Sequence, residues 1–405
     1  MAKRFRTYYH QGNRRDIRTS GYQTDHMENN RIYIGVIADD FTGASDAASF
    51  LKEGRLSTVL CSGIPASSYT AEAVVIALKT RSIPAGEAVR ESLAAARYLK
   101  EIGAEQIYFK YCSTFDSVPE GNIGPVADTL MEYLKVPYTL LCPSLPANGR
   151  TVREGHLYVD GIPLHESHMR HHPLNPMWDD RIPELMRRQS RYPVYLNDTE
   201  DHAGRRYYVP DYVTEEDGER IAEQYGHLPL LTGGSGLIKH LAQLHSTGQQ
   251  DTAETAAKPG RAVLLAGSCS IMTRKQIRTY TESGKTAVQL KAEELLAGKQ
   301  TNASLCREMD QAGEEILFYS SDSPDNIANY NIPKGTDLSA LFEDVMQKLA
   351  IHAQKTGRTR IITAGGETSG AVTDSLGYRI FRIGQSIAPG CRSWCRGKII
   401  PYGWC

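Results

Sequence analysis

Short apolar runs that alternate with helix-like segments constrain the fold of this chain more than any other feature of its sequence. Each run has four to seven residues, a length typical of strands that are buried on both faces of a parallel sheet. We predict strands at residues 32–38, 57–61, 73–78, 106–111, 138–142, 229–232, 262–266, 316–320 and 360–363. We predict helices between them at residues 44–52, 85–102, 126–134, 214–225, 273–283 and 337–356. The alternation predicts an α/β fold with two domains, each with a mostly parallel sheet flanked by helices.

The composition argues against several classes of protein. The 46 basic and 47 acidic residues give a formal net charge of -1, without the positive excess of a nucleic-acid-binding protein. No apolar run approaches the ~18 residues of a membrane span, and no charged start precedes an apolar signal region. The eight cysteines are scattered along the chain, which suits a reducing compartment. We therefore expect a cytoplasmic protein that binds neither nucleic acid nor membrane.

Changes in composition predict the domain boundaries. Residues 1–30 are polar, basic and without periodicity, and are expected to be a disordered or non-native extension, with a nucleic-acid arm as the alternative. Met27 closely precedes the first strand and is a candidate native start. Residues 31–245 form the first predicted domain and residues 261–390 the second. Between them, residues 246–260 are small, polar and bounded by Gly and Pro, which predicts a linker.

The proline-rich middle of the first domain, residues 143–206, is expected to consist mostly of loop. Several histidines gather there between His156 and His172. They form no HExxH pattern, so ordinary loop polarity is favoured over metal ligation, and no metal ligands are assigned.

Charged residues follow several predicted strands of the first domain. Asp39 and Asp40 follow the first strand, and Arg81 and Lys110 come after later ones. Ligands in open α/β sheets bind at the carboxyl ends of strands, where these side chains would converge. The acids are candidates for bonding a substrate hydroxyl, acting as a base or holding a metal, with a helix cap as the plain alternative. The basic residues can bind a carboxylate or a phosphate.

Two loops of small residues stand out in the second domain. Residues 267–270 and 365–370 each join a predicted strand to a helix. Free backbone N–H groups at such a helix start suit a phosphate, and Glu367 could touch a phosphate-bound Mg²⁺ through water. Ordinary turns are the alternative. The chain has no GxxxxGK[ST] loop and no protein-kinase signature.

Several motifs together resemble the four-carbon acid sugar kinases, and most closely the 3-oxo-tetronate kinase branch. They are IGVIADDFTGASDAASFL, VVIALKTRSIPA, FKYCSTFDS, GNIGPVAD, CPSLPANGRTV, ESHMRHHPLNPM, LTGGSGL, LLAGSCS and ITAGGETSGAV. The resemblance covers roughly residues 32–390. It implies an acid-sugar-binding domain followed by an ATP-binding domain. The implied reaction is ATP-dependent phosphorylation of the terminal hydroxyl of 3-dehydrotetronate, with Mg²⁺ as the nucleotide complex.

The resemblance also implies roles for individual residues. The acid sugar would contact Asp39, Asp40, Arg81, Lys110 and Asp116, and Asp40 or Asp39 would be the catalytic base. The nucleotide would contact Ser268, Ser270, Gly365, Gly366, Glu367 and Thr368. The substrate stereoisomer and the oligomeric state, for which a homodimer is one alternative, stay open.

The end of the chain departs from the family pattern. Residues 391–405 form an atypical tail without the strand and Gly-rich loop that would complete the ATP site. A truncated relative that binds ligand without turnover is therefore the alternative function. A metal-dependent hydrolase, built on the acid pair and the histidines, is a weaker third.

Overall fold

The computed structural model describes residues 31–65, 71–171, 175–196, 198, 202–246, 260–321, 332–333, 335–388, 391–396 and 403–404. The chain from Arg31 onward forms one unit by its contacts. The predicted N-terminal extension, the candidate start at Met27 and most of the predicted linker lie outside the described residues. No described helix is both long enough and apolar enough to cross a membrane.

The first half of the described chain builds a parallel sheet from the apolar runs. Its strands, in spatial order, are β11 (Leu230–Gly233), β4 (Gln106–Lys110), β1 (Ile34–Ala38), β3 (Ala73–Ala77) and β2 (Thr58–Ser62). In the centre, Ile34 of β1 pairs with Ala73 of β3 and with Gln106 of β4. Every residue of β1 and β3 is buried, as expected for strands covered on both faces. The predicted parallel sheet is confirmed.

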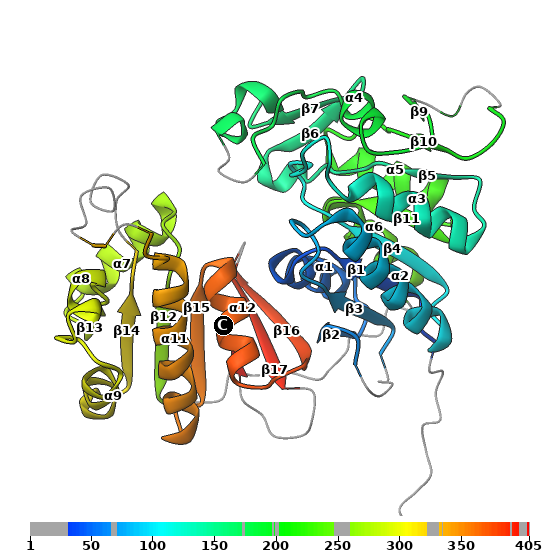
Figure 1. Cartoon of the computed structure of the whole chain (residues 1–405). Coiled ribbons are helices and arrows are strands. Elements are labelled where there is room, and N and C mark those ends of the chain that lie inside the picture. The colour runs from blue at the N-terminus through cyan, green and yellow to red at the C-terminus, as the bar shows by residue number, and fades with distance from the viewer. Residues whose placement is uncertain are drawn as a thin grey trace, which may run out of the picture. The chain divides into compact units, whose positions relative to one another are not determined.

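Helices cover both faces of this sheet. They are α1 (Phe41–Glu53), α2 (Ala85–Glu101), α3 (Ile123–Leu134), α5 (Glu215–Tyr225) and α6 (Gly236–His245). Helices α1 and α6 pack with Val36 of β1 into one apolar cluster. Helices α2 and α3 pack with Ile37 into another, because successive side chains of a strand point to opposite faces. Figure 1 shows α1 and α2 on opposite sides of β1.

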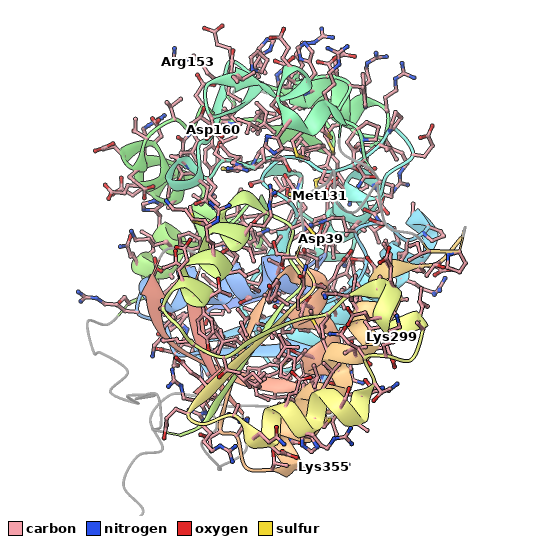
Figure 2. All side chains as sticks on the ribbon, turned by 90° about the vertical axis from the view of Figure 1, so that its left-hand side faces the viewer. Asp39, Met131, Arg153, Asp160, Lys299 and Lys355 are labelled. Carbon is pink, nitrogen blue, oxygen red and sulfur yellow. The ribbon has the colours of Figure 1, made fainter. Side chains whose placement is uncertain are left out.

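The middle of the first half is more ordered than the predicted loop. The strand predicted at residues 138–142 is β5 (Tyr138–Leu140). The segment after it contains β6 (Arg150–Arg153), β7 (His156–Val159), β8 (Ile162–Pro163), α4 (Ile182–Arg187), β9 (Val194–Tyr195) and β10 (Arg206–Tyr208). Short 3₁₀ turns lie at Pro146–Asn148, Leu164–Glu166 and His168–His171. These strands have two to four residues, too few to display a period-2 pattern. Arg153 and Asp160, at the two turns of the β6–β7–β8 hairpins, lie on the outer surface (Figure 2).

The second half of the described chain repeats the parallel architecture. Its strands, in spatial order, are β15 (Arg360–Ala364), β12 (Ala262–Ala266), β14 (Glu315–Tyr319) and β13 (Ala287–Gln289). Its helices are α7 (Ile271–Glu282), α8 (Ala292–Leu296), α9 (Asn302–Gln311), α11 (Leu338–Lys355) and α12 (Gly366–Ser375). Asp337 caps α11 by accepting from the backbone N of Ala340 at 3.0 Å.

Antiparallel strands join the two parallel sections, which the sequence did not predict. They are β16 (Ile380–Ala388), β17 (Cys391–Arg396) and β18 (Gly403–Trp404). Strand β16 pairs antiparallel with both β2 and β17, and β17 pairs antiparallel with β18, which in turn pairs parallel with β15. The described strands therefore include one twelve-stranded sheet. Residues 391–396, expected to belong to an atypical tail, form a strand. The edge of β16 offers backbone hydrogen-bond partners to an extended segment.

Candidate functional site

A buried ion pair links two of the predicted site residues. Asp39 follows β1 directly and is 4% exposed. Arg81 donates from Nε to Asp39 Oδ2 at 2.9 Å and from Nη2 to Asp39 Oδ1 at 2.7 Å. Burial lowers the pKa of Arg81, but the opposite charges of Asp39 and Asp40 raise it far above its ordinary value. The guanidinium is therefore charged and is held by two bonds to Asp39.

Asp40 has the helix-capping role that the sequence analysis gave as the plain alternative. Its Oδ1 caps α1 by accepting from the backbone N of Gly43 at 2.7 Å, and it lies 2.9 Å from Arg81 Nη2. Its side chain is 29% exposed, against 6% for that of Asp39. Burial, and then the charge of Asp39, raise the pKa of Asp40 against the opposing charges of Arg81 and Lys110. A cap with a raised pKa can also exchange a proton with a ligand.

Gly43 allows two charged side chains to approach the start of α1. A Cβ atom built on Gly43 would lie 2.5 Å from Asp40 Oδ1 and 2.9 Å from Lys110 Nζ. Lys110 ends β4, is 3% exposed and donates to the carbonyl oxygen of Tyr111 at 2.7 Å. We call Asp39, Asp40, Arg81 and Lys110 the charged cluster. The structure brings these four predicted residues together at the carboxyl ends of β1, β3 and β4, as expected for a ligand site in a parallel sheet.

Asn122 supports the charged cluster and was not assigned from the sequence. It is 5% exposed, and its Nδ2 donates to the carbonyl oxygens of Thr80, Arg81 and Ile83. These bonds hold the loop that carries Arg81. Asn122 stands in the GNIG motif, but only the fold brings that motif against a loop some forty residues earlier in the chain. Asp116, the remaining predicted sugar contact, is buried in the loop after β4 at 8% exposure.

The GGSG motif serves close packing of the backbone. A Cβ atom on Gly234 would lie 2.3 Å from the carbonyl oxygen of Pro143, and one on Gly236 would lie 2.4 Å from that of Ser144. Only glycine permits this approach between the start of α6 and the chain after β5. The motif therefore has a structural function that explains its composition.

The two small-residue loops of the second half lie side by side. The backbone N atoms of Gly267 and Ser268 both donate to the carbonyl oxygen of Ala364, at 2.9 and 3.0 Å. A Cβ atom on Gly267 would lie 2.1 Å from Thr368 Oγ1. The two predicted loops are thus adjacent and together form one surface at the carboxyl ends of β12 and β15.

Each of these loops leads into a helix. Ser270 caps α7 by accepting from the backbone N of Thr273 at 3.1 Å. Gly365 precedes α12 with φ +120, a conformation that side-chain-bearing residues rarely adopt. The unpaired N–H groups and the positive dipole end of such helix starts favour a phosphate group.

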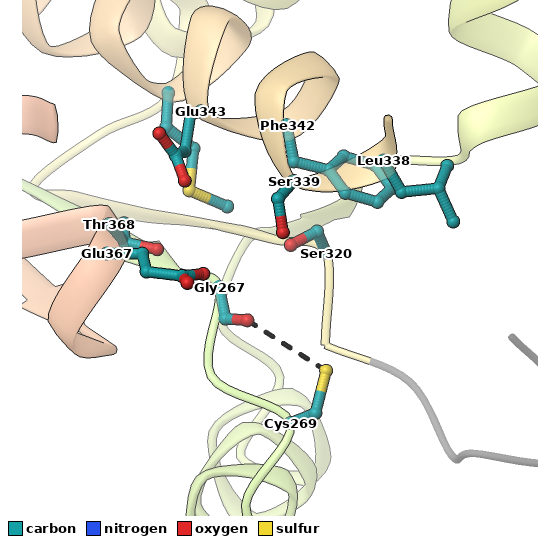
Figure 3. A pocket seen from close by; sticks show the side chains of 10 residues that line it. Gly267, Cys269, Ser320, Leu338, Ser339, Phe342, Glu343, Glu367 and Thr368 are labelled. Atoms are coloured by element: carbon teal, nitrogen blue, oxygen red, sulfur yellow. Dashed lines mark hydrogen bonds between the residues drawn. The ribbon is translucent and has the colours of Figure 1, made fainter. Parts of the chain in front are cut away.

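A cavity of about 210 Å³ opens beside these loops. The strand-end loops contribute one wall, and the first turns of α11 contribute the other. Its lining consists of Gly267, Cys269, Ser320, Leu338, Ser339, Phe342, Glu343, Met346, Glu367 and Thr368. Figure 3 shows Glu343 and Glu367 on one side of the cavity and Phe342 with Leu338 on the other. The cavity therefore has a polar and an apolar part.

The second-half loops also contact the first half. A Cβ atom on Gly366 would lie 2.7 Å from Thr42 Oγ1, and Thr42 follows the acid pair by two residues. At the other end of α12, Asp374 Oδ2 lies 2.5 Å from Lys79 Nζ, two residues before Arg81. The candidate phosphate loop is therefore adjacent to the two segments that carry the charged cluster.

The histidine-rich segment contains a carboxylate shared by two imidazoles. His156 Nδ1 and His165 Nδ1 lie 2.6 and 2.7 Å from the two carboxylate oxygens of Asp180. Within the described ranges, no three His, Cys, Asp or Glu residues are grouped to hold a metal ion. His172 lies outside the described residues.

Two family profiles match this chain in succession. A sugar-binding N-terminal domain matches residues 34–241, and a nucleotide-binding C-terminal domain matches residues 263–402. The first contains the charged cluster, and the second contains both small-residue loops and the cavity. A sugar-binding domain followed by a nucleotide-binding domain defines the class of enzymes that phosphorylate sugars.

Curated relatives show to which family of sugar-phosphorylating enzymes this chain belongs. The 3-oxo-tetronate kinase of Escherichia coli K12 is 42% identical over 388 residues, covering 89% of this chain and 100% of the relative. That of Salmonella typhimurium LT2 is 43% identical over 384 residues, covering 89% and 91%. This chain belongs to the 3-oxo-tetronate kinase family and is a sugar-acid kinase, which confirms the resemblance.

Solved structures share the fold. A Salmonella typhimurium LT2 protein described as a putative tRNA synthase superimposes with a TM-score of 0.83 at 40% identity, covering 92% of this chain and 94% of that protein. A Haemophilus influenzae protein superimposes with a TM-score of 0.77 at 39% identity, covering 91% and 95%. The α/β architecture is thus common to these relatives.

Proposed function

We propose that this kinase transfers the γ-phosphoryl group of ATP to the terminal, 4-position hydroxyl of 3-dehydrotetronate. The names of the curated relatives support the substrate class. The observation that carries the proposal is the close approach of Thr42 to Gly366, which leaves no room for a Cβ atom on that glycine. This approach sets the candidate phosphate loop against the acid motif. Phosphoryl transfer asks the protein chiefly for positioning and for neutralisation of charge.

Asp40 is the residue that we propose as the base. Asp39 is nearly inaccessible, and both its oxygens accept from Arg81. Asp40 is more exposed and has a raised pKa, so it can take the proton of the substrate hydroxyl as the phosphoryl group arrives. A positioned base typically contributes about 10²–10⁴-fold to the rate. Asp39 then acts as a positioning residue that fixes Arg81 beside Asp40.

To bind the carboxylate of the acid sugar, a basic side chain must have N–H donors that no other residue uses. Arg81 commits Nε and Nη2 to Asp39, which leaves Nη1 for a ligand. Lys110 has three donors, of which one serves Tyr111. We therefore propose that Lys110 and Nη1 of Arg81 together bind the carboxylate. Asp116, buried in the loop after β4, is proposed to accept from a substrate hydroxyl.

The nucleotide is proposed to bind in the second half. Ser268, Ser270 and the backbone of Gly365 and Gly366 would hold the phosphates, with Thr368 as a hydroxyl donor. Mg²⁺ prefers hard oxygen ligands, and the exposed carboxylate of Glu367 at the first turn of α12 is such a donor beside the phosphate loops. When bound, Mg²⁺ would neutralise charge on the β- and γ-phosphates. Accordingly, residues 31–245 would bind the acid sugar and residues 261–390 the nucleotide.

A coupled assay of ADP release tests the proposal. The enzyme receives Mg-ATP with each stereoisomer of 3-dehydrotetronate, with a four-carbon acid that lacks the terminal hydroxyl, or with no acid. We expect ADP release only with a hydroxyl-bearing acid, and phosphorus–proton coupling in the NMR spectrum of the product to the C4 protons. ATP and acid sugar that bind without turnover would instead identify a non-catalytic relative. Coupling to another carbon would overturn the 4-position.

A further inference from the structure

Helix α11 begins with an apolar and an acidic surface that the core covers only in part. Val345, Met346 and Leu349 are at most 3% exposed and belong to the main apolar cluster. One and two turns earlier, Phe342 and Leu338 are only half-buried and line the cavity. The apolar stripe of this helix therefore serves the core at its middle and a ligand cavity at its start.

The ring of Phe342 has the surroundings of a stacking platform. It packs partly on the core, which limits its rotation, while its outer part faces the cavity. Figure 3 shows it beside Leu338, with Ser339 and Ser320 pointing toward one another nearby. An aromatic face flanked by an aliphatic side chain and two hydroxyls suits a flat heterocycle with polar edges.

Glu343 lies in the same cavity as Glu367. Glu343 is half-buried at the first turns of α11. Two carboxylates that repel each other in one cavity are stabilised by a ligand that donates hydrogen bonds to one of them. A carboxylate that accepts from ribose hydroxyls is the usual solution at nucleoside sites of α/β proteins.

We infer that the start of α11 binds the nucleoside of the nucleotide, with Phe342 and Leu338 against the base and Glu343 accepting from the ribose hydroxyls. The inference rests on the proposed function, since it needs ATP in the second half of the chain. The phosphate loops at Gly267 and Thr368 form the opposite wall of the cavity. A nucleotide with its phosphates on those loops would thus extend its base and ribose toward α11.

Calorimetric binding of three probes separates the subsites. The probes are a non-hydrolysable ATP analogue, its 2′,3′-dideoxy form and inorganic tripolyphosphate, each with Mg²⁺. We expect Phe342→Ala to weaken binding of the ATP analogue by about 10-fold or more, which is the usual scale of base stacking on an aromatic ring. The affinity for tripolyphosphate should be unchanged. Phe342→Leu keeps the apolar packing but removes the aromatic stacking surface. Its affinity for the ATP analogue should therefore lie between those of the unaltered enzyme and of Phe342→Ala.

Glu343→Gln tests the ribose contact. The unaltered enzyme should bind the ATP analogue several-fold more tightly than the dideoxy form, and Glu343→Gln should bring that ratio close to one. Asp344→Asn is the matched control, because Asp344 is exposed on the same helix, pairs with Lys348 at 2.6 Å and lies outside the cavity. It should leave both affinities unchanged.

The outcomes distinguish failure of this inference from failure of the proposed function. If the unaltered enzyme binds neither the ATP analogue nor tripolyphosphate, the proposed function is wrong, and the inference falls with it. If the analogue binds equally well to all variants, the nucleoside subsite is wrong and the kinase proposal stands. If Glu343→Gln weakens binding of tripolyphosphate as much as binding of the ATP analogue, Glu343 acts on Mg²⁺, and the inference of a ribose contact is wrong.

Discussion

Asp40 shows at the scale of one residue how function and stability oppose each other. Its carboxylate is partly buried, lies beside Asp39 and has a raised pKa. A group whose pKa is higher in the folded than in the unfolded chain favours folding below its unfolded pKa. That contribution is lost as pH rises through the folded pKa. Above its folded pKa the ionised carboxylate therefore costs stability, which is typical of groups retained for chemistry.

Asp40→Asn should remove turnover without weakening the fold. Asn is as good a helix cap as Asp, and Arg81 keeps both its bonds to Asp39. We expect kcat to fall by about 10²–10⁴-fold and the thermal midpoint at pH 7 to equal or exceed that of the unaltered enzyme. Steady-state kinetics and calorimetry measure the two quantities. Unchanged turnover would transfer the role of base to Asp39.

The raised pKa of Asp40 also predicts the pH dependence of the reaction. A base must be deprotonated, so kcat should fall as pH decreases through the pKa of Asp40. The acidic limb should then lie above the value of about 3.9 for an unperturbed Asp. A pH–rate profile between pH 4 and 8 measures it, with the coupling enzymes in excess at every pH. A limb at or below the ordinary Asp value would contradict the assignment.

Gly43→Ala tests the crowding around the charged cluster. The added methyl would lie 2.5 Å from Asp40 Oδ1 and 2.9 Å from Lys110 Nζ, so both charged groups must move. A displacement of about 1 Å can cost about 100-fold in rate, which we expect in kcat/KM. Gly86→Ala, in the first turn of α2 with no atom within 4 Å of the added methyl, is the control and should keep full activity.

At the scale of helices, strands and loops, local sequence patterns predicted helix starts most reliably. Thr214 and Asp217 form the capping box at α5, and Asp337 caps α11. Both helices were predicted, because capping depends on residues within one turn. The short strands β6 to β10 were missed, since segments of two to four residues show no clear alternation of apolar and polar residues. Asn122 was missed because its partners lie on another loop.

Gly234→Ala should destabilise the junction between β11 and α6. The methyl would lie 2.3 Å from a backbone oxygen of Pro143, and backbone cannot swing aside as a side chain does. We expect a loss of about 1–3 kcal/mol in the free energy of unfolding, measured by urea titration. Gly313→Ala, also next to a strand but with no atom within 4 Å of the methyl, should change it by less than about 0.5 kcal/mol. Equal effects of the two variants would refute the packing role.

At the scale of the whole molecule, one apolar cluster runs through both halves of the described chain. It includes Leu60 of β2, Phe381 of β16 and Val263 of β12. Phe41, the residue after the acid pair, packs edge-on against Phe381 with 6.0 Å between ring centroids. The two profile-matched regions are therefore coupled through shared packing as well as through shared strands.

Phe381→Ala should unfold both halves more readily. Phe381 is 1% exposed, and removing a buried Phe side chain costs about 3–5 kcal/mol. Hydrogen exchange followed by mass spectrometry should show peptides of both halves losing protection at the same denaturant concentration. Ile64→Ala, at a side chain that is 43% exposed, is the control. Loss of protection confined to the second half would mean that the halves unfold independently.

The sequence alone determined most of the parallel strands, most of the helices, the two small-residue loops and the acid pair at the end of β1. These features depend on residues that are close in the sequence. They follow from the spacing of apolar residues, from helix caps and from the residues that come directly after a strand. Only the tertiary structure decided that Arg81 is held by Asp39, that Asn122 supports its loop, that β16 joins the two sheets and that α11 lines the cavity. Each of these requires segments distant in sequence to meet, and such contacts depend on the packing of the whole chain rather than on any local pattern.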